Sequence, residues 1–90
     1  MIAIVDDYKP VREALESIMR SLGYRTSTFG SAEDVLKSEK LHDTSCLITD
    51  VQMPGLTGID LQDRLNASGH RIPIIFLLRL ILVRTLGHAR

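Results

Sequence analysis

The sequence predicts an α/β fold in which a parallel sheet carries helices between its strands. Short runs of apolar or β-favouring residues alternate with segments whose apolar residues recur every three or four positions. The connections are short, and no internal repeat, low-complexity tract or long linker interrupts them. Because such strand-helix-strand units close with right-handed crossovers, the βαβαβαβ order predicts parallel strands in one sheet.

Length and composition set the limits within which this fold must work. A chain of 90 residues supports one domain with one core, and 44% apolar with 24% charged residues is ordinary globular composition. The net charge is zero, although residues 1–63 carry −5 and residues 64–90 carry +5. The five Arg of the second part are too dispersed to form a basic patch, so we expect no direct nucleic-acid binding.

The first three elements follow from the pattern of residues 2–29. Residues 2–5 form a short apolar strand. Pro10 suits the first turn of the amphipathic helix that follows, and Gly23 suits its C-terminal end. Residues 24–29, rich in β-favouring but polar side chains, predict a second strand near a sheet edge.

The second half of the sheet is predicted from residues 31–76. Ser31 caps a second helix, which ends in the polar stretch 37–44. The near-continuous apolar run at 45–49 is typical of a central strand covered on both faces. A third helix then runs from Thr57-Gly58 to near Gly69, and a fourth strand covers residues 72–76.

Three acidic residues stand where two of these strands end. Asp6 and Asp7 follow the first strand, and Asp50 follows the third. Ligands of open parallel α/β sheets bind outside the carboxyl ends of the strands. If the first and third strands are neighbours, three carboxylates crowd together, and their repulsion favours a hard divalent cation such as Mg²⁺.

A carboxylate in this position can also act as a nucleophile and form an aspartyl phosphate. Asp50 suits that role because it alone lies on the central strand. The alternative is that Asp6 and Asp7 merely cap the following helix and that Asp50 begins a turn. Their joint position at matching strand ends favours the metal site.

The remaining candidate residues predict no chemistry. Cys46 is the only cysteine, which excludes an internal disulfide, and it reads as a small hydrophobe in a reducing compartment. His42, His70 and His88 are scattered, without metal-ligand spacing to Cys46. No signal peptide is visible, and the apolar run 72–83 is shorter than a membrane span, so we expect a cytoplasmic protein without membrane contact.

These motifs together carry a family resemblance. Over residues 1–76 the chain resembles the receiver domain of two-component response regulators, in the style of nodulation and nitrogen-fixation regulators. The matching stretches are Ile4-Val5-Asp6-Asp7, Pro10-Val11-Arg12, Ile48-Thr49-Asp50-Val51-Gln52-Met53-Pro54-Gly55 with Gly58, and Ile72-Pro73-Ile74-Ile75-Phe76.

The resemblance implies a flavodoxin-like fold with strand order 2-1-3-4. It also implies that Asp50 accepts a phosphoryl group from the phosphohistidine of a sensor histidine kinase. Asp6, Asp7, Asp50 and the backbone carbonyl of Gln52 would surround Mg²⁺. The protein would then be an acceptor rather than an enzyme, with at most weak catalysis of its own phosphorylation and dephosphorylation.

The chain departs from the family after Phe76. The resemblance expects a Thr or Ser where Leu78 stands, and a later Lys, but no Lys follows Lys40. Residues 77–90 form an apolar and Arg-rich tail that does not resemble a receiver, which suggests a frameshift or an altered coding sequence. We expect impaired transmission of the phosphorylation signal.

This incomplete fold, βαβαβαβ plus a tail, has a physical consequence. The fourth strand is expected to be an exposed edge, and the first helix to lack a neighbour over its apolar flank. We therefore expect a homodimer or higher oligomer through that edge and the tail, which is helical or swapped. One alternative function is a non-signalling oligomerisation module with a vestigial acidic site. A carboxylate-nucleophile phosphatase is weaker, because it requires Asp-x-Asp at the first strand.

Overall fold

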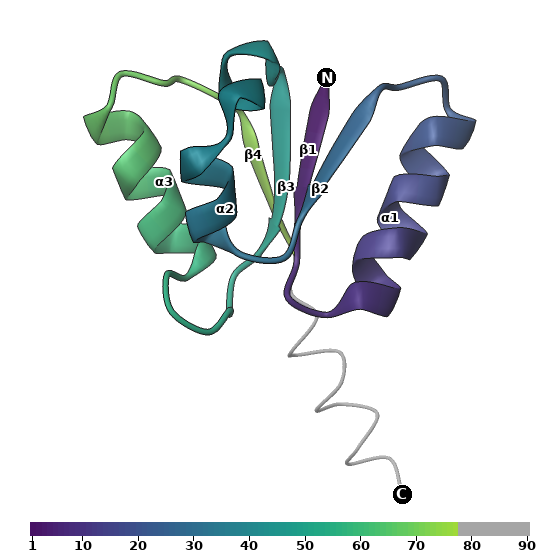
Figure 1. Cartoon of the computed structure of the whole chain (residues 1–90), viewed down its shortest axis with the longest axis horizontal. Helices are drawn as coiled ribbons and strands as arrows, with labels where there is room; N and C mark the ends of the chain where they lie inside the picture. The colour runs from purple at the N-terminus through teal and green to yellow at the C-terminus, as the bar shows by residue number, and fades with distance from the viewer. Residues whose placement is uncertain (78–90) are drawn as a thin grey trace, which may run out of the picture.

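The computed structural model describes residues 1–77, and these form a four-stranded parallel sheet with helices on both faces (Figure 1). In chain order the elements are β1 (Ile2–Val5), α1 (Lys9–Ser21), β2 (Thr26–Phe29), α2 (Ala32–Lys37), the short 3₁₀ helix η1 (Glu39–Asp43), β3 (Cys46–Asp50), α3 (Gly58–Ala67) and β4 (Ile74–Leu77).

The strand order is β2-β1-β3-β4, with every neighbouring pair parallel. The predicted α/β class and the order 2-1-3-4 are therefore confirmed. Ala3 of β1 is level with Ser27 of β2 and with Leu47 of β3, and Leu47 is level with Ile74 of β4. This register brings the carboxyl ends of β1 and β3 to the same edge of the sheet.

One face of the sheet holds the hydrophobic core. Helices α2 and α3 cover this face, whereas α1 lies on the opposite face (Figure 1). Strand and helix side chains interlock here because alternate strand residues point to the same side. The buried cluster consists of Ala3, Val5, Ala32, Val35, Leu41, Leu47, Met53, Leu61 and Leu65.

The other face is covered less completely. Ile4 and Ile48 are buried there, but α1 itself has no buried residue. Ile18 of α1 and Leu22 at its C-cap are 51% and 65% exposed, and Ile75 of β4 is 52% exposed. Within residues 1–77, β4 is an edge strand, and α1 leaves its apolar flank largely open, as the sequence predicts.

The end of α1 explains one shift from the predicted boundaries. Helix α1 ends in a Schellman-type arrangement, since the N–H groups of Gly23 and Tyr24 donate to the carbonyls of Arg20 and Met19 at 3.0 and 3.1 Å. Tyr24 therefore belongs to the end of α1, and β2 begins at Thr26 rather than at residue 24.

The 3₁₀ helix η1 is absent from the sequence prediction, which has only a polar connection over 37–44. The hydroxyl of Ser38 accepts a hydrogen bond from the N–H of Lys40 at 3.1 Å, which starts the turn. Leu41 then anchors η1, because its side chain is buried in the core. A single apolar residue in a polar stretch gave no periodic signal from which this turn could be read.

Asp50 is the last residue of β3 and pairs with Leu77, rather than following the strand. Strand β4 begins at Ile74 and not at residue 72, and Pro73 contributes only its carbonyl, which accepts from the N–H of Leu47 at 2.9 Å.

The predicted tail, residues 77–90, lies outside the described residues except for Leu77. No helix within residues 1–77 is long and apolar enough to cross a bilayer.

Candidate functional site

The sheet register places three carboxylates at one point. Val5 of β1 is level with Thr49 of β3, so the next residues, Asp6 and Asp50, lie side by side. One carboxylate oxygen from each of Asp6, Asp7 and Asp50 lies within 4.8 Å of the others. Among residues 1–77 this is the one group of three or more His, Cys, Asp or Glu side chains close enough to hold a metal ion.

The three acids differ in their access to water. Asp6 is 0% and Asp50 is 2% exposed, whereas Asp7 is exposed. Bringing two buried carboxylates so close is costly unless a cation or hydrogen bonds offset their charge. The set offers hard oxygen donors with one open side, which fits a divalent cation such as Mg²⁺ that keeps some of its water.

Short backbone contacts hold Asp6 and Asp50 in place. The N–H of Tyr8 donates to Asp6 Oδ1 at 2.8 Å, and the N–H of Gln52 donates to Asp50 Oδ1 at 3.2 Å. In the second contact the Asp50 side chain accepts from the backbone N–H two residues later, as at the start of an Asx turn. The interpretation that Asp50 begins a turn is therefore correct. The interpretation of Asp6 as the helix cap is wrong, because the N-cap of α1 is Tyr8, whose side chain makes no capping hydrogen bond.

The turn after β3 brings α3 very close to Asp50. Gly58, the first residue of α3, is buried, and its N–H donates to the carbonyl of Val51 at 3.1 Å. A Cβ atom at this position would collide with the backbone oxygen of Asp50 and would lie 3.3 Å from the ring of Phe76. Gly58 is therefore required by packing behind the acidic cluster.

Arg12 is a neighbour of the site to which the sequence assigns no role. Its Nη1 donates to the backbone carbonyl of Asp6 at 2.7 Å and lies 3.5 Å from where a Cβ of Gly30 would be. The half-buried Arg12 thus ties α1 to the end of β1 and passes close to Gly30, just after β2. Only its place one turn into α1, just after the acids, hinted at this contact.

Other sequence candidates lie elsewhere. The rings of His42 and His70 are in contact, with centroids 5.4 Å apart, and Cys46 begins β3 at the opposite end from Asp50. The half-buried Cys46 is less enclosed than predicted, because the face that it shares with Ile48 is covered only by α1. Met53 is buried in the core and Pro54 is exposed, which suits structural roles in the turn.

A parallel 2-1-3-4 sheet with paired acids after β1 and one acid at the tip of β3 defines the receiver class of α/β domains. The chain matches the response regulator receiver domain over residues 2–79 and belongs to that family. This match confirms the resemblance read from the motifs.

Individual relatives agree with the family. The chain is 46% identical over 77 residues to the response regulator TmoT of Ectopseudomonas mendocina, covering 86% of this chain and 35% of TmoT. It is 40% identical to nodulation protein W of Bradyrhizobium diazoefficiens, covering 86% and 34%. It therefore spans about a third of the length of these relatives.

Solved structures show the same fold. The response regulator StyR superposes with a TM-score of 0.79 at 40% identity, covering 83% of this chain and 38% of StyR. TrrA from Thermotoga maritima, solved in complex with Mg²⁺-BeF, gives a TM-score of 0.76 at 28% identity, covering 83% of this chain and 65% of TrrA. The flavodoxin-like receiver fold predicted from the motifs is thus confirmed.

Proposed function

We propose that this chain is the phosphoacceptor of a two-component phosphorelay and that Asp50 accepts the phosphoryl group from a sensor histidine kinase. The observation that carries the proposal is the convergence of Asp6, Asp7 and Asp50 within 4.8 Å at the carboxyl ends of β1 and β3. Membership of the receiver family supports the same role. We place the protein in the cytoplasm, where such kinases present their phosphohistidine.

Asp50 is the acid best placed to react, because it is itself the last residue of β3, whereas Asp6 and Asp7 follow the end of β1. The contact with the Gln52 amide holds its carboxylate at the strand tip. An oxygen of Asp50 attacks the phosphorus of the phosphohistidine. A P–O bond forms as the P–N bond breaks, and the imidazole nitrogen leaves with the electron pair. Asp50 is a substrate in this transfer, so the chain acts as an acceptor rather than as an enzyme that turns over.

The residues that would hold Mg²⁺ are Asp6, Asp7 and Asp50, with the backbone carbonyl of Gln52 as a fourth oxygen donor. Bound Mg²⁺ supplies positive charge that offsets both the carboxylates and the transferring phosphoryl group. Asp6, held by the Tyr8 amide, would be the fixed ligand, and the exposed Asp7 the one on the solvent side.

Titration of the full chain with Mg²⁺ and beryllofluoride, followed by amide NMR, tests the site. We expect saturable shifts around Asp50 that require both reagents and that disappear in Asp50→Asn. Acetyl phosphate with Mg²⁺ should add one phosphoryl group by intact mass in the wild type only. Equal modification of Asp50→Asn, or no response of the wild type to either reagent, would refute the proposal.

Transmission of the signal is a separate step, and we propose that it is impaired in this chain. The support is the sequence position of Leu78, which stands where the family has a hydroxyl, and which lies outside the described residues. The substitution Leu78→Thr restores a hydroxyl group at this position. It should increase the beryllofluoride-induced change in distant amides without changing Mg²⁺ affinity, whereas an unchanged response would contradict the idea.

A second candidate function, self-association, rests on a different observation. An apolar groove of about 500 Å³ lies between α1 and the sheet, and exposed Ile75 extends it to β4. Its lining residues are Met1, Ile2, Met19, Leu22, Tyr24, Ser45, Cys46, Ile48 and Ile75. We propose that a homodimer or higher oligomer forms through this side and the β4 edge, to which the tail also contributes.

Light scattering coupled to sizing separates this candidate from a monomeric acceptor. Ile75→Lys should dissociate the oligomer, because a charge on an edge strand opposes pairing. Ile59→Lys is the matched control, since Ile59 is 46% exposed on α3, away from the groove. A wild-type chain that is monomeric at micromolar concentration would exclude self-association and leave the acceptor role intact.

A further inference from the structure

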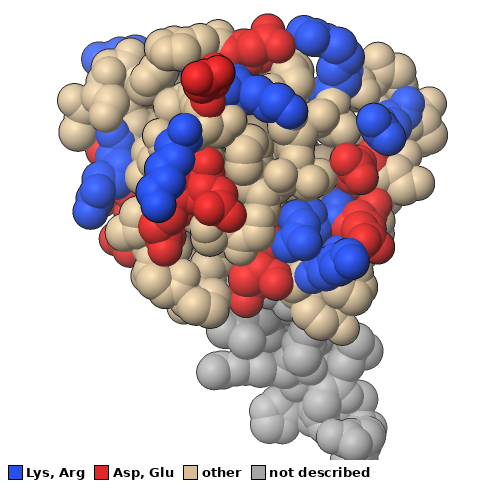
Figure 2. Space-filling model, in the orientation of Figure 1, with Lys and Arg blue, Asp and Glu red and all other residues tan. Residues whose placement is uncertain are grey.

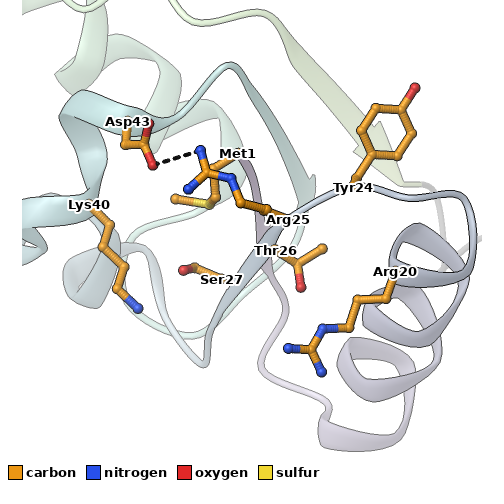
Figure 3. Close-up of a pocket in the computed structure, with 8 residues that line it drawn as sticks. All are labelled: Met1, Arg20, Tyr24, Arg25, Thr26, Ser27, Lys40 and Asp43. Carbon is orange, nitrogen blue, oxygen red and sulfur yellow. Dashed lines mark hydrogen bonds and ion pairs between the residues drawn. The ribbon is translucent and has the colours of Figure 1, made fainter.

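A polar cavity lies at the β2 edge of the sheet, away from the acidic cluster. It encloses about 430 Å³ beside β2 (Figure 3). The residues that line it come from α1, from β2 and the residues before it, from η1 and from the N-terminus. They are Met1, Arg20, Tyr24, Arg25, Thr26, Ser27, Lys40 and Asp43.

The backbone of β2 is open on this side. The carbonyls of Arg25 and Phe29 accept from the N–H groups of Ile2 and Asp6 at 2.9 and 3.1 Å, so these alternate residues face β1. In a parallel ladder alternate residues point their N–H and C=O groups to opposite sides, so Ser27 also faces β1, whereas Thr26 and Thr28 face away from it. Thr26, which lines the cavity, and the exposed Thr28 two residues further on therefore present N–H and C=O groups that pair with no other strand within residues 1–77.

Cations flank this open edge on both faces of the sheet. Arg20 reaches it from α1 on one face and Lys40 from η1 on the other, as Figure 3 shows. Arg25 is already paired with Asp43, at 3.2 Å. Within residues 1–77, neither Arg20 nor Lys40 has an acidic side chain at salt-bridge distance, so both exposed cations are available to an acidic partner.

We propose that the β2 edge binds an extended acidic segment of another protein, which adds to the sheet as a fifth strand. Its backbone would pair with the outward groups of Thr26 and Thr28, and main-chain pairing of this kind supplies affinity. Successive side chains of a strand point to opposite faces. Two adjacent acids would therefore meet Arg20 on one face and Lys40 on the other, and this spacing supplies specificity.

Other occupants fit the edge less well. Residues 64–90 contain no acid, so the chain's own C-terminal part cannot supply the complementary charge. Two copies paired edge to edge through β2 would bring Arg20 and Lys40 of each copy close to those of the other, and the like charges would repel. A polyanionic nucleic acid would need a continuous basic surface, whereas Figure 2 shows Lys and Arg interspersed with Asp and Glu on the face drawn.

A pair of synthetic peptides tests the proposal on the isotope-labelled full chain. The probe is Val-Thr-Glu-Glu-Thr-Val with blocked ends, and the control is Val-Thr-Gln-Gln-Thr-Val. We expect the acidic peptide to shift the amides of Thr26 and Thr28 saturably and to slow their hydrogen exchange, with weaker binding at high salt. The proposal is overturned by equal binding of the two peptides, or by an acidic peptide that leaves those two amides unchanged.

Charge removal separates edge binding from general attraction. Arg20→Gln with Lys40→Gln should weaken the acidic peptide about tenfold, since each exposed pair contributes up to about fivefold. Arg64→Gln on α3 is the matched control, because it removes an exposed cation far from the cavity and should leave the affinity unchanged. A loss per removed cation that is the same in both variants would show that net charge alone draws the peptide, and would also overturn the proposal.

Discussion

The two faces of the sheet differ in how much of their apolar surface is covered. On the α2 and α3 face, Leu61 is 0% exposed and belongs to a closed core. On the α1 face, Leu22 is 65% exposed although α1 has the stronger amphipathic pattern of the two long helices. Amphipathic periodicity therefore forms a helix and orients it, but the neighbours on either side decide how deeply it is buried.

The largest expected effect is a difference between two Leu→Ala substitutions, one on each face. Leu61→Ala removes a fully buried side chain and should cost about 2–5 kcal/mol of the free energy of unfolding. Leu22→Ala should change it by no more than about 0.5 kcal/mol, because the side chain is mostly in water. Urea unfolding followed by far-UV circular dichroism measures both. Comparable losses would mean that the α1 face carries a core of its own.

A glycine pair tests the tight contact behind the acidic cluster. Gly58→Ala forces a methyl group against the backbone of Asp50 and should destabilise the fold by about 1–3 kcal/mol. Gly30→Ala meets only Arg12 Nη1 at 3.5 Å, which is ordinary van der Waals contact, and should be close to neutral. Gly58→Ala should also shift the Asp50 amide, so a near-neutral result without such a shift would contradict the packing seen here.

The capping box of α3 gives a smaller, pH-dependent effect. The N–H of Asp60 donates to Thr57 Oγ1 at 3.1 Å, and the N–H of Thr57 donates to Asp60 Oδ2 at 3.0 Å. Thr57→Ala should cost about 1 kcal/mol of the free energy of unfolding, measured by urea. Asp34→Ala in α2 is the comparison. The side chain of Asp34 forms no capping box, so its removal should cost less of the free energy of unfolding.

The Asp60 carboxylate sets the pH dependence of that cap. The hydrogen bond from the Thr57 backbone lowers the pKa of Asp60 below its usual value of 3.8, with smaller contributions from the Thr57 side chain and Arg64. A lowered pKa means that the stabilisation is complete above pH 3.8 and is lost as the pH falls below it. Asp60→Asn should flatten that part of the stability profile. If the loss of stability below pH 3.8 is the same in Asp60→Asn as in the wild type, other carboxyl groups control it.

The smallest effect is expected on α1. Lys9 and Glu13 form an i,i+4 pair at 3.7 Å, with side chains 73% and 62% exposed. Glu13→Gln should change the free energy of unfolding by no more than about 0.5 kcal/mol, and 0.5 M salt should remove even that difference. A larger loss would mean that α1 depends on its charges rather than on contact with the sheet.

Much of the site could be predicted because its acidic residues lie at the ends of strands that can be recognised in the sequence. The continuous apolar run ending in Asp50 identified a central strand, and the acids at the ends of two such runs predicted their convergence, which the sheet register brings about. Contacts between distant segments left no comparable signal. The Arg12 bond to the Asp6 carbonyl and the anchoring of η1 by Leu41 depend on which segments become neighbours, and periodicity does not report that.

The open α1 face changes how the folded state of this chain should be recognised in solution. A folded domain that exposes Ile18, Leu22 and Ile75 beside an apolar groove should bind the dye ANS. Its near-UV circular dichroism should be weak as well, because the chain has no Trp and both Tyr8 and Tyr24 are more than half exposed. Dye binding with a weak near-UV signal usually indicates a molten globule. For this chain, slow amide exchange in β1 and β3 is the measurement that separates the ordered fold from a molten one.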